Sequence, residues 1–322
     1  MSVIKFKQDI LNAILELLWK QWTQLGVAGQ ISTKNHFVLD PEALLIFSAH
    51  FARYDQRLYD LVINWLQCNG ESINLPRLKA ILKLSVDADQ KSLGFISASV
   101  KMKKWNAFAK TLLPQNVKIE PLFFENTFAP QLDEIALHYG FKRNIYVPNN
   151  KVMSFPIQGN ASLLLRLRGA FGMSARAEAV LAMLDKNFCK IQDVADLGCF
   201  SWKAARDVLD ELYSSGVVIT LDKNKRRRNY FLKSSNVICR LFEIEKVIFP
   251  DWITIFNMLT TVWICFNTPR ITEVSEKTVL SQFEREFITK NNDSLQNCKI
   301  ASLSKLTPNS IFNLPKIIQE IN

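Results

Sequence analysis

The residues best suited to chemistry with another molecule are the cations between positions 223 and 228. Five of these six residues are basic, and they are Lys223, Lys225, Arg226, Arg227 and Arg228. Like charges this close repel one another and contribute nothing to folding, whereas a phosphate backbone would neutralise them. The stretch therefore predicts contacts with the phosphates of a nucleic acid.

Residue patterns typical of catalysis or cofactor binding do not occur. The three histidines, His36, His50 and His138, lie far apart and lack the spacing of a zinc site. There is no G-x-S-x-G, no G-x-G-x-x-G, no Gly-Lys dipeptide and no C-x-x-C. Cys189 and Cys199 are expected to be buried thiols rather than a redox pair. We therefore expect no enzyme activity, no cofactor and no metal.

The positive charge is concentrated in the middle of the chain. The 322 residues carry a net charge of +10, and residues 151–233 hold 14 Lys and Arg against 8 Asp and Glu, a net of +6. Residues 234–322 are balanced, with 9 of each sign. A nucleic-acid surface is therefore expected in the middle segment.

The elements around these cations follow a recognisable order. Ser174 is a suitable N-cap for one helix, and a short second helix covers 192–197. After the turn Gly198-Cys199-Phe200, Ser201 caps a third helix over 202–214. Strands at 217–221 and 227–233 then form a hairpin whose basic tip, with its flanks, spans 222–230. Three helices and a hairpin are the order of a winged helix.

Residues 161–233 resemble the winged helix-turn-helix regulators of bacteria, broadly of the MarR and ArsR groups. The resemblance rests on Ile191-Gln-Asp-Val-Ala-Asp-Leu197, on Ser201-Trp-Lys-Ala-Ala-Arg-Asp-Val-Leu-Asp-Glu-Leu212, on Ser215-Gly-Val-Val218 and on the basic wing. In that family the matching helix enters the major groove and the wing contacts phosphates. The resemblance implies DNA contacts from the third helix and the wing. The expected contact residues are Ser201, Trp202, Lys203, Arg206, Lys223, Lys225, Arg226, Arg227, Arg228 and Tyr230.

Two details of this surface stay open in the sequence. Tyr230 and Phe231 alternate along the second strand, so one packs inward and the other lies beside the duplex. Arg166, Arg168 and Arg176 either extend the basic face or, as we favour, point into solvent.

The remaining chain is expected to form helical regions on both sides. We expect a mainly α fold with a small β-hairpin, divided into 1–150, 161–233 and 236–322. In the first region a helical bundle is favoured over a degenerate helix-turn-helix, and short strands are expected at 117–124 and 141–147. The uncharged stretch 252–269 is expected to be a buried helix rather than a membrane span.

The expected function is sequence-specific DNA binding by a transcriptional regulator, with a repressor favoured. A homodimer on double-stranded DNA is expected, because one recognition helix covers too few base pairs for useful specificity. The alternative is an antitoxin or adaptor protein that binds a partner protein, with or without DNA. The start of the chain does not read as a secretory signal, and unpaired cysteines favour the cytoplasm.

Overall fold

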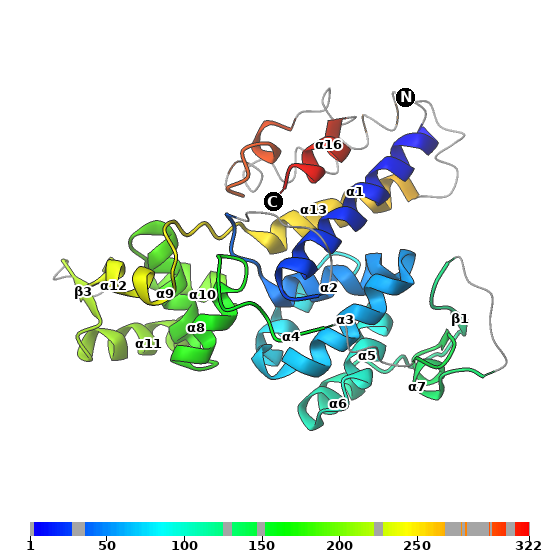
Figure 1. Cartoon of the computed structure of the whole chain (residues 1–322), viewed down its shortest axis with the longest axis horizontal. Coiled ribbons are helices and arrows are strands. Elements are labelled where there is room, and N and C mark those ends of the chain that lie inside the picture. Colours follow the sequence, from blue (N-terminus) through cyan, green and yellow to red (C-terminus); the bar gives the residue numbers. More distant parts are fainter. Residues whose placement is uncertain are drawn as a thin grey trace.

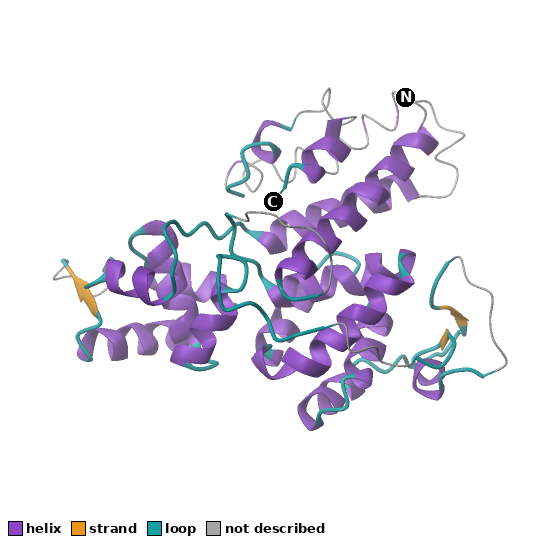
Figure 2. Ribbon diagram, viewed as in Figure 1, coloured by secondary structure: helices purple, strands orange, loops and turns teal. Residues whose placement is uncertain are grey.

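The chain is mainly helical, as predicted from its sequence (Figure 2). The computed structural model describes residues 3–27, 36–124, 131–146, 152–221, 228–267, 298–306 and 313–321, with the single positions 278, 281 and 296. All statements below concern these residues. The wing cations Lys223, Lys225, Arg226 and Arg227 lie outside them.

Six α-helices open the chain and pack around a core rich in tryptophan and phenylalanine. They are α1 (Val3–Gln24), α2 (Pro41–Phe51), α3 (Gln56–Asn69), α4 (Leu75–Leu84), α5 (Gln90–Ser99) and α6 (Lys103–Lys110). Asp40 accepts a hydrogen bond from the Ala43 amide at 3.1 Å and Asp55 accepts one from the Leu58 amide at 3.0 Å. Asp40 and Asp55 are thus the N-caps of α2 and α3. We refer to α1–α6 as the N-terminal helices.

A small parallel pair follows these helices. Strand β1 (Glu120–Pro121) pairs with β2 (Phe141–Lys142), and α7 (Glu134–His138) precedes β2. The expected strands at 117–124 and 141–147 are therefore much shorter than predicted. Val117 and Ile119 are each 49% exposed, so their apolar side chains do not have the buried face that a longer strand would need.

Helices from the end of the chain complete the core of the N-terminal helices. Phe256 of α13 (Trp252–Asn267) stacks on Phe47 of α2 at 4.4 Å, and Phe266 meets Phe6 of α1 at 4.8 Å. Figure 1 shows α16 (Leu314–Gln319) beside α1. The stretch 252–267 is thus a helix with one side in the core, as predicted. Of the helices in the described ranges, none combines the length and the apolar composition needed to cross a bilayer.

Residues 163–221 and 228–241 form the opposite end of the molecule from β1 and α7 (Figure 1). The helices are α8 (Leu163–Phe171), α9 (Ala175–Lys186), α10 (Ile191–Gly198), α11 (Trp202–Ser214) and α12 (Ser235–Leu241). Strand β3 (Val218–Thr220) pairs antiparallel with β4 (Tyr230–Leu232), and a single bridge joins Cys189 to Tyr230. The third predicted helix, 202–214, has the bounds of α11. Of the predicted basic tip at 222–230, residues 222–227 lie outside the described residues.

The turn between α10 and α11 depends on one glycine. A Cβ atom at Gly198 would lie 2.2 Å from the Phe200 ring, so no other residue fits there without moving that ring. Cys199, the next residue, adopts a left-handed backbone conformation with φ of 52°. Only Cys199, Phe200 and Ser201 therefore separate α10 from α11.

Candidate nucleic-acid interface

The first turns of α11 present three of the predicted contact residues to solvent. The Ser201 hydroxyl accepts a hydrogen bond from the Ala204 amide at 3.2 Å and so caps the helix, as predicted. Ala205, Leu209 and Leu212 point into the core. Trp202 is 49% exposed and Lys203 is exposed, while Arg206 is half-buried. One side of α11 therefore packs against the core, and the other side, which we call its open side, faces solvent.

Charge is divided along α11. Lys203 and Arg206 belong to its first half, whereas Asp207, Asp210 and Glu211 follow. The Arg206 guanidinium lies 5.6 Å from the Trp202 ring centroid and pairs with Asp207, with Nη2 2.6 Å from Oδ1. This neighbouring carboxylate raises the pKa of Arg206. Positive charge for a phosphate backbone therefore lies at the start of the helix.

The base of the predicted wing lies near the end of α11. Arg228, the one wing cation in the described residues, has its guanidinium 5.6 Å from the ring centroid of Tyr213. Its Nε is buried and has no hydrogen-bond partner among the described residues. A donor that is buried and unpaired is one that a ligand can satisfy.

Tyr230 does not lie where its predicted role requires. Its side chain is 1% exposed, and its backbone exchanges two 2.9 Å hydrogen bonds with Cys189. Burial raises the pKa of its hydroxyl. The prediction of a direct DNA contact from Tyr230 is therefore wrong, because β4 turns this ring toward the core. Phe231 is the half-buried neighbour, and its ring lies 5.9 Å from that of Phe188.

A cavity of about 360 Å³ separates α11 from β4. It brings together four predicted residues, Trp202, Arg206, Arg228 and Tyr230, and adds Asp210, Tyr213, Ser214 and Ile191. Tyr213 was not predicted from the sequence. The spacing in the sequence could have identified it, because residues 202, 206, 210 and 213 are four, four and three apart and so share one side of a helix.

Five buried charges join this end of the molecule to the N-terminal helices, and we call them the ionic cluster. They are Asp40, Glu42, Arg77, Arg168 and Glu178, each 2% exposed or less. The Arg77 guanidinium donates to both Asp40 carboxylate oxygens, at 2.7 and 2.6 Å, and to the Leu197 carbonyl at 2.8 Å. Although burial alone would raise it, Arg77 holds the pKa of Asp40 below its ordinary value. The last turn of α10 is therefore tied to α4.

Arg168 belongs to the same cluster, and its predicted exposure to solvent is wrong. Its Nη1 donates to Glu42 Oε1 at 2.6 Å, and its Nη2 donates to Glu178 Oε1 at 2.9 Å. The two carboxylates compensate the loss of hydration that burial of a guanidinium causes. Arg168 therefore joins α8 to α2 and α9 and is not part of a basic surface.

Arg166 and Arg176 are also engaged within the chain. Arg166 donates to the carbonyls of Ile157 and Phe242, both at 2.8 Å, and Arg176 pairs with Glu211 at 2.5 Å. The basic surface is thus not extended by free guanidinium groups at these two positions.

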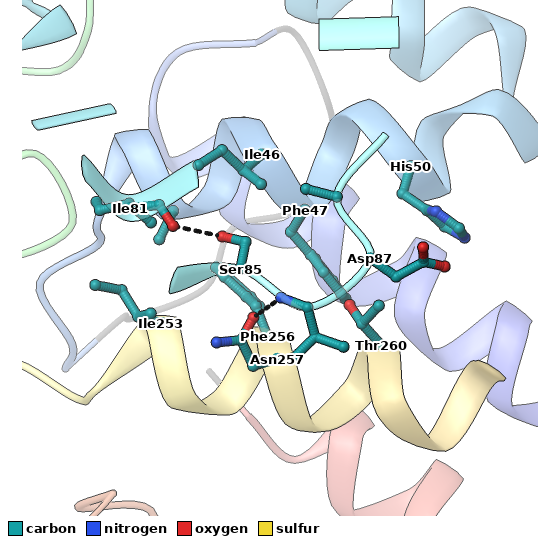
Figure 3. A pocket seen from close by; sticks show the side chains of 13 residues that line it. Ile46, Phe47, His50, Ile81, Ser85, Asp87, Ile253, Phe256, Asn257 and Thr260 are labelled. Carbon is teal, nitrogen blue, oxygen red and sulfur yellow. Dashed lines mark hydrogen bonds between the residues drawn. The ribbon is translucent and has the colours of Figure 1, made fainter. Parts of the chain in front are cut away.

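A second cavity, shown in Figure 3, lies between α2, α13 and the residues after α4. Its volume is about 20 Å³, which is room for roughly one water molecule. His50 and Asp87 lie at one end (Figure 3), and burial lowers the pKa of His50, which favours a neutral imidazole. Within the described ranges, no three His, Cys, Asp or Glu side chains are placed to hold a metal ion. The cavity is too small for a substrate.

Searches against known proteins returned no counterpart for this chain: no protein-family model matches it, and no curated protein or solved structure is similar to it.

Proposed function

We propose that residues 161–233 form a winged helix that binds double-stranded DNA as a transcriptional regulator, with repression the favoured outcome. The observation that carries this proposal is the open side of α11. Trp202, Lys203 and Arg206 stand at its exposed start, and Arg228 lies at the base of the adjacent strand pair. A helix that presents cations at its N-terminal end beside a basic hairpin suits the major groove and the flanking phosphates.

The order of the elements supports the same proposal. Helix α9, the bridge at Cys189, helices α10 and α11, and strands β3 and β4 follow one another in the sequence expected for a winged helix. The tight turn at Gly198 and Cys199 connects α10 to α11, and the two helices pack against each other. The net charge of +6 over residues 151–233 supplies the attraction to a polyanion.

The proposal includes a homodimer. One helix in a groove reads only a few base pairs, and two copies related by a two-fold axis read a palindromic site of useful length. The mass of the DNA complex, measured by light scattering, tests this part of the proposal.

The main test is fluorescence anisotropy with the DNA upstream of the gene and with a random duplex of equal length, each at two salt concentrations. We expect tighter binding to the upstream DNA. Replacing Arg226, Arg227 and Arg228 by alanine should weaken binding to both duplexes and flatten the salt slope by about 0.9 for each phosphate contact that is lost.

The matched control removes three cations from a distant helix. Lys103, Lys104 and Lys110 of α6 lie at exposed or half-exposed positions, and their replacement by alanine lowers the net charge by the same amount. We expect nearly unchanged binding from this variant. Equal losses from both triple variants would show a nonspecific effect of net charge, and unchanged binding in the wing variant would refute the proposal.

A second candidate function, an adaptor or antitoxin that binds a partner protein, is favoured by the surface of α12. This helix buries none of its residues, and its apolar Val237 and Leu241 are 55% and 72% exposed. Exposed apolar side chains one helical turn apart are typical of a protein contact. Replacing both by serine should release a copurifying partner, and a chain that purifies alone would count against this function.

A further inference from the structure

The open side of α11 carries aromatic rings as well as charge. Trp202 and Tyr213 are 49% and 43% exposed, although large aromatic side chains are usually buried. Each ring has a guanidinium near its face, that of Arg206 for Trp202 and that of Arg228 for Tyr213, both at 5.6 Å. The arrangement holds two flat apolar surfaces in contact with solvent.

These rings stand at the cavity of about 360 Å³ between α11 and β4. That volume is at the small end of the roughly 300–1,000 Å³ found for pockets that enclose organic ligands. An occupant of one or two aromatic rings fits this space, and a longer chain or a folded segment does not.

The polar groups of the cavity select the chemistry of the occupant. Asp210 lines the cavity at an exposed position, between Trp202 and Tyr213 in the sequence of α11. A carboxylate accepts hydrogen bonds and repels phosphate, so it suits a planar ring that carries an amino group. The unpaired Nε of Arg228 offers a donor to a ring carbonyl or to a phosphate attached to the occupant.

We propose that this cavity binds one unpaired nucleobase of DNA, stacked on Tyr213 or Trp202, with its exocyclic amino group donating to Asp210. A paired base hides its faces in the stack of the duplex, so only a bulged or displaced base reaches the rings. Thymine has no amino group and is disfavoured. The inference rests on the proposed function, and it specifies that the bound DNA has a base out of the helix.

The test compares three duplexes of the same flanking sequence by fluorescence anisotropy with the full chain. One is fully paired, one has a bulged cytosine and one has a bulged thymine. We expect the cytosine bulge to bind at least about fivefold more tightly than the paired duplex, since stacking of a single base on an aromatic ring gives this much or more. The affinity for the thymine bulge should lie between the affinities for the cytosine bulge and for the paired duplex.

Variants of exposed residues assign the effect to the cavity. Tyr213→Ala combined with Trp202→Ala should make the affinities for the bulged and the paired duplex equal, although the loss of Trp202 also weakens binding to the paired duplex. Asp210→Asn should remove the preference for cytosine over thymine. Glu211→Gln removes an equal charge from α11 at an exposed position that does not line the cavity, and it should keep both preferences. Circular dichroism confirms that each variant is folded.

Equal affinity for bulged and paired duplexes would overturn this inference and leave the proposed function standing. A bulge preference that survives loss of both rings would also overturn it. Absence of binding to every duplex would refute the inference together with the proposed function.

Discussion

Tyr230 and Phe231 are neighbours with opposite surroundings, and the difference decides what each can do. Tyr230 is 1% exposed and packs against the core, while Phe231 is half-buried near Phe188. Alternation along a strand predicts that adjacent side chains diverge, but it does not say which one faces the core. That choice depends on the pairing of β4 with Cys189 and β3, which the local sequence does not contain.

Substitutions at Tyr230 and Trp202 should therefore separate stability from binding. Tyr230→Ala is expected to lower the free energy of unfolding by about 3 kcal/mol or more, because it leaves a cavity in the core. Trp202→Ala should lower it by less than about 1 kcal/mol, because half of that ring is already in solvent. Urea denaturation of both variants measures this difference, and similar losses would contradict it.

Cys189 should be unreactive in the folded chain. Burial raises the pKa of its thiol to about 12, whereas Cys68 is exposed. The thiolate is the reactive form, so a thiol reagent at pH 8 should modify Cys68 and spare Cys189 until the chain is unfolded. Mass spectrometry of peptides after a timed reaction distinguishes the two sites.

The raised pKa of Cys189 also makes the free energy of unfolding depend on pH. The folded chain binds the Cys189 proton more tightly than the unfolded chain does, so this contribution is complete below the ordinary thiol pKa. It decreases as the pH rises from about 9 toward 12. Cys189→Ala, compared with the unchanged chain in denaturation at pH 8 and pH 10, should show a weaker dependence on pH.

At the scale of elements, α11 was predictable and the packing of α8 was not. Ser201, the stripe of Ala205, Leu209 and Leu212, and Gly216 with its φ of 75° are all local signals, and together they fix the bounds of α11. Arg168 of α8 is different, because one of its partners, Glu42, lies 126 residues earlier. A lone arginine on a helix usually faces solvent, and only the folded chain places a carboxylate beside it.

Breaking the ionic cluster should cost far more than breaking a surface pair. Arg168→Met is expected to lower the free energy of unfolding by about 3–5 kcal/mol, because it leaves Glu178 buried without its arginine and leaves Glu42 with Arg77 alone. Arg176→Ala removes an arginine whose pair with Glu211 is largely exposed, and its cost should be below about 1 kcal/mol. Calorimetry of the two variants tests the contrast, and equal costs would show that the cluster is hydrated in solution.

At the scale of the whole molecule, sequence order and spatial order differ. Helices α13 and α16 of the last region pack on α1 and α2 of the first, so the division between 1–150 and 236–322 describes the sequence rather than separate cores. Leu314 and Ile318 of α16 are fully buried, and the Lys20 ammonium of α1 donates to the Gln319 carbonyl at 2.9 Å. Amphipathic spacing predicts helices, but it does not name the helix on which each one packs.

Removing residues 313–322 should therefore destabilise α1, at the start of the chain. We expect faster hydrogen exchange in the amides of α1, because α16 covers one of its faces. The amides of α11 serve as an internal control and should keep their exchange rates. Uniformly faster exchange would mean that α16 stabilises the whole fold, and unchanged exchange in α1 would contradict the packing described here.

The ionic cluster also limits how descendants of this sequence can diverge. Losing any one of its five charges leaves the others buried without a full set of partners. Exchanging several of them together for apolar side chains can leave stability unchanged. The cluster therefore evolves as one coupled set, although its positions 40, 42, 77, 168 and 178 are spread over more than a hundred residues. A substitution at one of these positions is tolerated only together with compensating substitutions at the others. We therefore expect the ionic cluster to change rarely in related sequences, and as a group.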